Sequence, residues 1–199
     1  AITSFTVNMG KPLTLSNLSL KAWEKVFSRA SIISSTTNSF LTATAAAFFG
    51  ILISCVMAYL LQRTNVKGKR IPDFLITLGS GTPSVTIALA LIISMSGKFG
   101  INIYNTLTIM VVAYMIKYML MGMRTVVSAM SQVHPSLEEA AQISGANWLR
   151  MLKDVTLPLI GASIVAGIFL IFMPSFYELT MSTLLYSSKT KTIGYELYI

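Results

Sequence analysis

Long apolar runs without a charged side chain constrain this sequence more than any other feature. The first run covers residues 39–61. At a rise of about 1.5 Å per residue, a helix of this length crosses a hydrocarbon core roughly 30 Å thick. Because 54% of the residues are hydrophobic and only 11% are charged, a soluble domain is excluded and an all-α integral membrane protein is predicted. Four spans are expected, at about 39–61, 74–95, 104–120 and 157–173.

Small side chains recur at every fourth position of the first span. They are Thr42, Ala46, Gly50, Ser54 and Ala58. At this spacing they lie along one face of a helix, where the backbone of another helix can approach closely. We predict a helix-packing seam on this face; a face that lines a substrate path is the alternative.

The second span contains helix-breaking residues near its start. Residues 79–83 read Gly-Ser-Gly-Thr-Pro. Such residues are tolerated in a membrane where neighbouring helices or a cavity satisfy the freed backbone groups. Two interpretations stay open: irregular backbone that lines a translocation path, with Pro83 on it, or a plain kink.

In the third span, Lys117 lies near the predicted end and is expected to extend its ammonium group to the membrane interface.

The positions of the charged residues indicate the topology. Four crossings place both ends of the chain on one side of the membrane and the loops 62–73 and 121–156 on the other. The loop 62–73 has the highest density of Lys and Arg, which the positive-inside rule assigns to the cytoplasm. Residues 1–38 are then an extracytoplasmic segment, with a short amphipathic helix near residues 20–29. The fourth span is expected to end at Pro174.

The net charge of +8 has an ordinary explanation in a membrane protein. Most positive residues flank the apolar runs, and no basic cluster alternates with aromatic residues as a nucleic-acid groove requires. No nucleic-acid partner is expected. The single cysteine, Cys55, excludes an internal disulfide and a cysteine-based metal site. The 12 methionines are interpreted as fillers of gaps between helices rather than as Cu(I) ligands.

A polar stretch at 134–154 interrupts the apolar pattern and predicts two short helices. Ser136 is expected to cap a helix that begins at Leu137, with Glu139 completing a capping box. Gly145 suits the left-handed conformation that ends a helix.

The second short helix is expected at 148–154, capped by Asn147 and carrying an apolar stripe. From the residues alone, an ordinary amphipathic loop on the membrane surface remains an alternative.

The same stretch resembles a known motif. Glu139-Ala140-Ala141, then Gly145, then Val155-Thr156-Leu157-Pro158 is similar to the EAA motif in permease subunits of type I binding-protein-dependent ABC importers. This resemblance implies a MetI-like helical bundle over residues 39–199, in which 121–156 is a cytoplasmic coupling loop. It also implies a multi-pass subunit of the bacterial cytoplasmic (inner) membrane. The residues implied to dock an ATPase subunit are Glu138, Glu139, Ala140, Ala141, Gly145, Leu157 and Pro158.

The partners that the resemblance implies are a dimer of ABC ATP-binding subunits, an extracytoplasmic solute-binding protein and a second permease half, on the same chain or on another. The chain begins at Ala1, and family members usually have spans before and after such a segment. A fragment that lacks flanking helices is therefore expected.

No phosphate-binding P-loop sequence occurs: Gly97-Lys98 has Ile92 and Phe99 at the other motif positions. The chain is thus expected to be a non-catalytic subunit without a cofactor of its own, whose partner uses ATP and Mg²⁺.

The resemblance extends from about residue 38 to residue 199. It includes two further stretches: residues 58–64 with Gly68, and Glu178-Leu179 with residues 184–186. Both stretches resemble the ferric-iron branch of the family, with thiamine, polyamine and phosphonate permeases close by. Gly79 and Pro83-Ser84 depart from that branch, which often has proline and Pro-Gly there. Ferric iron is the expected cargo, and the neighbouring branches supply the alternatives.

Glu178 and Tyr177 are candidates for the translocation path, because hard oxygen ligands suit Fe(III). The alternative is that Glu178 holds a re-entrant turn or pairs with a neighbouring helix, and no metal site is firmly assigned. A secondary transporter with broken helices and a non-transporting membrane interaction module are the competing functions.

Overall fold

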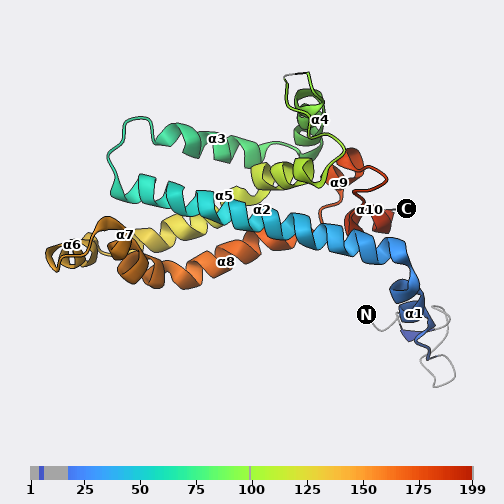
Figure 1. Ribbon diagram of the computed structural model, residues 1–199, viewed down its shortest axis with the longest axis horizontal. Coiled ribbons are helices and arrows are strands. Elements are labelled where there is room, and N and C mark those ends of the chain that lie inside the picture. Colours follow the sequence, from blue (N-terminus) through green and yellow to red (C-terminus); the bar gives the residue numbers. More distant parts are fainter. Residues whose placement is uncertain (1–4, 7–17, 99, 199) are drawn as a thin grey trace.

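Three long helices lie side by side in the computed structural model, which describes residues 5–6, 18–98 and 100–198 (Figure 1). They are α2 (Ala30–Arg63), α5 (Leu107–Gln132) and α8 (Leu157–Phe176), and each packs against the other two. The other elements are α1 (Lys21–Ser28), α3 (Arg70–Gly81), α4 (Ser84–Met95), α6 (Pro135–Ile143), α7 (Trp148–Met151), the π-helical turn η3 (Leu152–Thr156), α9 (Thr180–Leu185) and α10 (Ile193–Tyr198). This helical architecture confirms the predicted fold class.

Among the described residues, three helical segments are long and apolar enough to cross a membrane: α2, α5 and the continuous segment Trp148–Phe176. The pair α3 and α4 gives a fourth span if it is counted as one, but it is bent by 112°. The helix α3 lies along the bundle and α4 turns away from it (Figure 1). The predicted span 74–95 is therefore two helices. So large a bend is a break in the span and not a plain kink.

The break occurs where proline cannot continue the helix. The N–H of Thr82 still donates to Leu78 O at 3.1 Å. Pro83, the next residue, has no N–H, and it precedes the first residue of α4.

Two helices extend beyond the spans predicted for them. The helix α2 begins at Ala30 rather than at residue 39. The hydroxyls of Thr36 and Thr37 there donate to the carbonyls of residues 32 and 33, at 2.8 and 2.9 Å. The helix α5 continues to Gln132, because a buried stripe that includes Met123, Val126 and Met130 extends beyond residue 120.

Pro174 was predicted to end the fourth span, but it lies inside α8. Earlier along the chain, α1 confirms the helix predicted near residues 20–29. The rest of the predicted extramembrane segment includes residues 1–4 and 7–17, which lie outside the described residues.

Small residues allow the long helices to approach one another around Ile171. A Cβ added to Gly122 would lie 2.7 Å from Ile171 Cδ1, and one added to Gly50 would lie 3.1 Å from the same atom. A Cβ added to Gly167 would lie 2.7 Å from Ile51 Cδ1. The residues of the predicted seam are all buried within the bundle: Thr42, Ala46, Gly50, Ser54 and Ala58. The face that they form is thus covered by helices of this chain.

The two ends of the bundle differ. The elements α6 and α7 and the turn between α2 and α3 lie at one end, called here the loop end (Figure 1). The helices α1, α9 and α10 lie toward the other, called the terminal end (Figure 1). Both described chain ends therefore lie toward the terminal end, remote from α6, α7 and the turn between α2 and α3 (Figure 1).

Candidate functional site

The helix α6, which carries the Glu-Ala-Ala sequence, begins two residues before its predicted start. It starts at Pro135, and its N-cap is His134, whose Nδ1 accepts a hydrogen bond from the Ser136 N–H at 3.3 Å. Proline is favoured in a first helical turn because its missing N–H would have no partner there. Ser136 therefore lies inside the first turn, and the capping box expected for Ser136 and Glu139 is wrong.

The end of α6 confirms the sequence prediction. Gly145 has φ +88°, in the left-handed region. Its N–H donates to Gln142 O at 2.9 Å, and the Ala146 N–H donates to Ala141 O at 3.0 Å. This pair of bonds is the Schellman arrangement, which satisfies carbonyls at a helix end.

The segment after the glycine turn is one continuous helix rather than a separate helix followed by a span. The Asn147 side chain accepts from the Arg150 N–H at 2.8 Å, which confirms the predicted cap. The expected helix at 148–154 passes through η3 directly into α8. In η3 the Leu157 N–H bonds to Leu152 O. Pro158, the next residue, could not have donated the bond that an α-helical turn directs to Asp154 O.

A shallow groove of about 420 Å³ lies between α6 and the start of α8. The small residues of α6 form one wall, and Val155, Pro158 and Leu159 form the other. The first wall comprises Leu137, Ala140 and Ala141 of α6 and Ser144, the residue after its last turn. Small side chains here leave room for a group from outside the chain to approach the backbone of α6.

Apolar side chains of the groove lining are exposed: Leu137 is 47% exposed and Leu159 is 54% exposed. Elsewhere in the same loop, Ile143 on α6 is 88% exposed and Leu149 on α7 is 68% exposed. Among the predicted docking residues, Glu139, Gly145 and Leu157 are also exposed. Exposed apolar surface of this kind is typical of sites that contact another protein or a membrane.

Glu138 behaves differently from its neighbour Glu139. It is 7% exposed, and both of its carboxylate oxygens lie 3.1 Å from Arg63 Nε. The Thr156 hydroxyl donates to Oε1 of the same carboxylate at 3.0 Å. Glu138 therefore points into the bundle, whereas the other predicted docking residues lie around the groove or on the exposed side of the loop.

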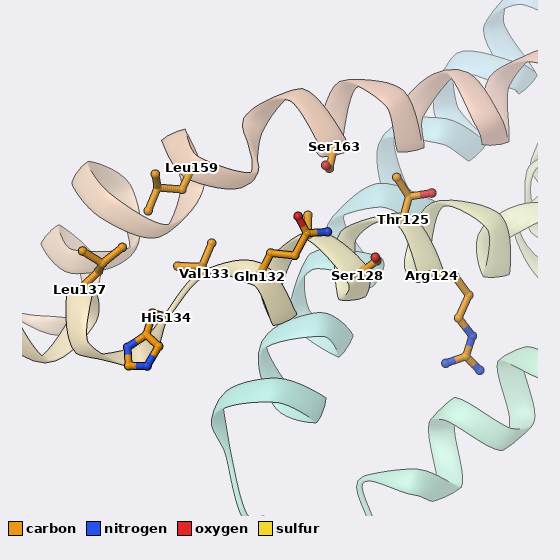
Figure 2. A pocket seen from close by; sticks show the side chains of 10 residues that line it. Arg124, Thr125, Ser128, Gln132, Val133, His134, Leu137, Leu159 and Ser163 are labelled. Carbon is orange, nitrogen blue, oxygen red and sulfur yellow. The ribbon is translucent and has the colours of Figure 1, made fainter.

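A larger polar groove of about 830 Å³ lies between α5 and α8, next to the start of α6 (Figure 2). In Figure 2, Thr125 on α5 and Ser163 on α8 lie on opposite walls, and Arg124 extends toward α3. The other polar groups come from α5 and the following turn: Ser128, Gln132 and His134. Sequence reasoning missed this groove. The available signal was the spacing of Arg124, Ser128 and Gln132, which recur every four residues along one helical face.

At the terminal end, Glu178 is 9% exposed and holds the start of α9. Its carboxylate accepts hydrogen bonds from the Tyr118 hydroxyl and from the Met181 N–H, the latter at 3.0 Å. Tyr177 is 63% exposed. The described residues contain no group of three or more His, Cys, Asp and Glu residues arranged to hold a metal ion.

Lys117 was expected to reach the interface but lies in the middle of α5. Its ammonium group donates to Ser80 O at 3.0 Å and to Thr82 O at 2.8 Å, at the break before Pro83. A Cβ added to Gly79 would lie 3.1 Å from Ile116 O. Close backbone contact therefore brings the broken span within reach of this lysine. In the first turn of α3, Asp73 forms an ion pair with Arg124 of α5 at 2.9 Å.

Comparison with known proteins relates the geometry to a family. The family model described as "Binding-protein-dependent transport system inner membrane component" matches residues 50–197. An Fe(3+)-transport system permease protein of Haemophilus influenzae is 26% identical over 162 residues, which cover 81% of this chain and 32% of that protein. The sulfate transport system permease protein of Salmonella typhimurium is 27% identical over 175 residues, covering 83% and 63%.

A solved structure has the same fold. It is a bacterial ABC transporter involved in the import of the acidic polysaccharide alginate, and its matched chain aligns with a TM-score of 0.77 at 17% identity. The alignment covers 98% of this chain and 69% of the other. The present chain thus spans about a third of the Fe(3+) permease, and about two thirds of both the sulfate permease and the alginate transporter chain.

Proposed function

Because this chain belongs to the family of binding-protein-dependent transport system inner membrane components, we propose that it is the permease subunit of an ATP-driven ABC importer. In this role, α6 docks on a dimer of ATP-hydrolysing subunits. The long helices, together with a second permease half, form the path for a solute that an external binding protein delivers. ATP hydrolysis takes place in the partner, which uses ATP and Mg²⁺.

The observation that carries this proposal is the surface of the loop end. Ala140, Ala141 and Pro158 line one groove together with the exposed Leu159, and Ile143 of α6 is also exposed. The Schellman turn at Gly145 fixes the end of α6, so this surface has a defined shape. Such a surface suits a rigid protein partner, and a loop that merely rests on lipid headgroups requires no defined groove.

The translocation path is assigned to the polar face of α5 and α8. A hydrophilic solute needs polar groups inside the membrane, and the groove of Figure 2 offers hydroxyl and amide groups on an otherwise apolar bundle. At the terminal end, Tyr177 is exposed on the route, while Glu178 shapes the entrance through its bonds to α5 and α9. Pro83 is assigned to the path as well, because the break before it contacts Lys117, whose neighbour Tyr118 bonds to Glu178.

Ferric iron is the proposed cargo. The support is the sequence likeness to the Fe(3+) permease, and the likeness to the sulfate permease defines the main competing class. To test it, the cognate binding protein is mixed with Fe(III), sulfate, thiamine, a polyamine or a phosphonate. The expected result is that only Fe(III) binds and that the loaded protein drives ATP-dependent ⁵⁵Fe uptake into proteoliposomes. Uptake of another solute in place of iron would contradict ferric iron as the cargo, but it would leave the proposed permease role intact.

Docking is tested by substitution within the groove. Ala141→Trp fills the space beside α6 and is expected to abolish co-purification of the ATPase subunit. Ala166→Trp is the matched control, since Ala166 is an exposed residue of α8 outside the groove. Equal retention of the ATPase subunit by both variants would rule out docking at this surface.

A secondary transporter makes a different prediction. Uptake would then continue when the ATPase subunit is omitted from the proteoliposomes, and it would follow an ion gradient instead of ATP. Uptake that stops without the ATPase subunit supports the importer. A membrane interaction module would show no uptake in either preparation.

A further inference from the structure

The buried carboxylate of Glu138 joins four parts of the fold at one point. It belongs to α6, and its ion-pair partner Arg63 is the last residue of α2. Arg63 Nη2 also donates to Val133 O, at the end of α5, at 2.6 Å. The Thr156 hydroxyl brings in η3, which continues into α8. The long helices of the bundle thus converge on this ion pair at the loop end.

This attachment is distinctive because α6 has little other burial. Glu138 is the only buried residue of the nine in α6. The side chains of Arg63 and Glu138 are each 9% exposed, whereas those of Arg150 and Asp154, in the same loop, are 74% and 55% exposed. This ion pair is therefore the one buried side-chain attachment of α6, in addition to its chain connection to α5 and its contacts with α7 and η3.

The chemistry of the pair suits a rigid connection. The Arg63 Nε group is shared between both carboxylate oxygens, and Nη2 of the same guanidinium donates to Val133 O, so the planar group is held at two of its nitrogens. Both groups are shielded from water, so the attraction is weakly screened. A charge left alone at this site would be costly, which favours keeping the two residues together as the helices move.

The far end of α2 is also fixed. At the terminal end, the Asn38 side chain donates to Lys191 O at 2.9 Å, and the Ser39 hydroxyl accepts from the Ile193 N–H at 2.9 Å. A movement that enters α2 at Arg63 therefore reaches the segment before α10. The helix links the two ends of the bundle.

We propose that Arg63 and Glu138 are positioning residues that couple α6 rigidly to α2, so that a movement imposed on α6 is transmitted along α2 to the terminal end. This inference rests on the proposed function, since the ATPase subunit would supply the movement. It gives Glu138 a role distinct from docking: the exposed residues of α6 contact the partner, and Glu138 transmits the motion inward.

The test measures the distance between α6 and α2 in the assembled importer. Spin labels are attached at Ile143 and Val56, which are 88% and 59% exposed, in a background where the single cysteine is replaced, Cys55→Ala. Pulsed electron paramagnetic resonance then compares the nucleotide-free complex with the complex trapped by ATP and vanadate in lipid nanodiscs. With Arg63 and Glu138 present, the distance distribution is expected to be narrow and the same in both states.

Glu138→Gln keeps the size of the side chain and removes its charge. The distribution is expected to remain narrow without nucleotide and to shift and broaden in the trapped complex. Arg63→Lys keeps the positive charge but loses the contact to both oxygens, so it should give a smaller shift of the distance distribution. It also serves as the test variant if Glu138→Gln does not fold. Arg150→Met is the matched control, because it breaks the exposed ion pair of the same loop, and it should leave both distributions unchanged.

Two outcomes would overturn the inference: identical distributions in the variants and the parent, or broadening of equal size in both nucleotide states, which indicates a purely structural role. Loss of the ATPase subunit from the spin-labelled parent has a different meaning. If the unlabelled complex also fails to retain that subunit, the proposed function fails; if it retains the subunit, label positions on the opposite face of α6 carry the measurement.

Discussion

The ammonium group of Lys117 lies 2.8 Å from the carbonyl oxygen of Thr82, at the point where the bent span breaks. The residue after Thr82 is a proline, so the backbone carbonyls before it lose the partners that a continuous helix would provide. A membrane offers no water to replace them. A lysine from the middle of α5 takes that place and also contacts Ser80 O.

Lys117→Met should therefore destabilise the protein. The substitution keeps the length and removes the donor, leaving two carbonyls without this partner at a cost of about 1–3 kcal/mol. The measurement is thermal unfolding in detergent, with Lys153→Met as the control, since Lys153 is exposed on η3. Equal melting temperatures would show that the carbonyls find other partners.

Gly145→Val should disturb the loop through backbone conformation alone. Gly145 has φ +88° with no atom within 4 Å of an added Cβ, so the penalty is the roughly 1–2 kcal/mol of a left-handed residue with a side chain. The expected result is weaker retention of the ATPase subunit. Gly161→Val is the control, because Gly161 also has open space around it but lies in the helical region of α8. A similar loss in both variants would assign the effect to bulk.

Gly167→Leu should separate the long helices. A Cβ there already falls 2.7 Å from Ile51 Cδ1 and 3.4 Å from Gly122 Cα, and a larger side chain has no room to turn aside. Overpacking of this kind costs about 1–3 kcal/mol. Gly161→Leu, on the same helix, is the control and should melt like the parent protein.

Glu178→Gln distinguishes the two interpretations of this carboxyl group. Glutamine can still accept a hydrogen bond from the Met181 N–H, so the start of α9 should survive and ATP-driven uptake should continue. The measurements are the melting temperature and the uptake of ⁵⁵Fe. An unchanged melting temperature together with lost uptake would instead identify Glu178 as a ligand of the cargo.

Local sequence signals predicted those parts of the site that local backbone chemistry determines. The end of α6 at Gly145 and the cap at Asn147 follow from single residues and their immediate neighbours, and both are confirmed. The predicted start of α6 is two residues too late, because Pro135 and Ser136 are both good helix-start residues. The choice between them depends on His134, whose ring acts as the cap.

Long-range pairing could not be read from the sequence. Lys117 was expected at an interface because the predicted third span ended near residue 120, whereas α5 continues to Gln132. Glu138 was grouped with Glu139 because adjacent acidic residues look alike in a sequence. Only the position of Arg63, which is distant along the chain, directs one of them inward and leaves the other exposed.

The π-helical turn at Leu152–Thr156 has a consequence for the loop end. A π turn accommodates an additional residue without breaking the helix, and one residue corresponds to about 100° of rotation in an α-helix. The side chains before the turn are therefore rotated relative to those of a regular helix. Trp148, before the turn, can then donate to the Tyr59 hydroxyl at 2.8 Å, while Thr156, the last residue of the turn, donates to Glu138. Deleting a single residue in this turn would restore a regular helix and rotate α7 out of phase with α8, so the chain length of this turn sets which partners both flanking segments can reach.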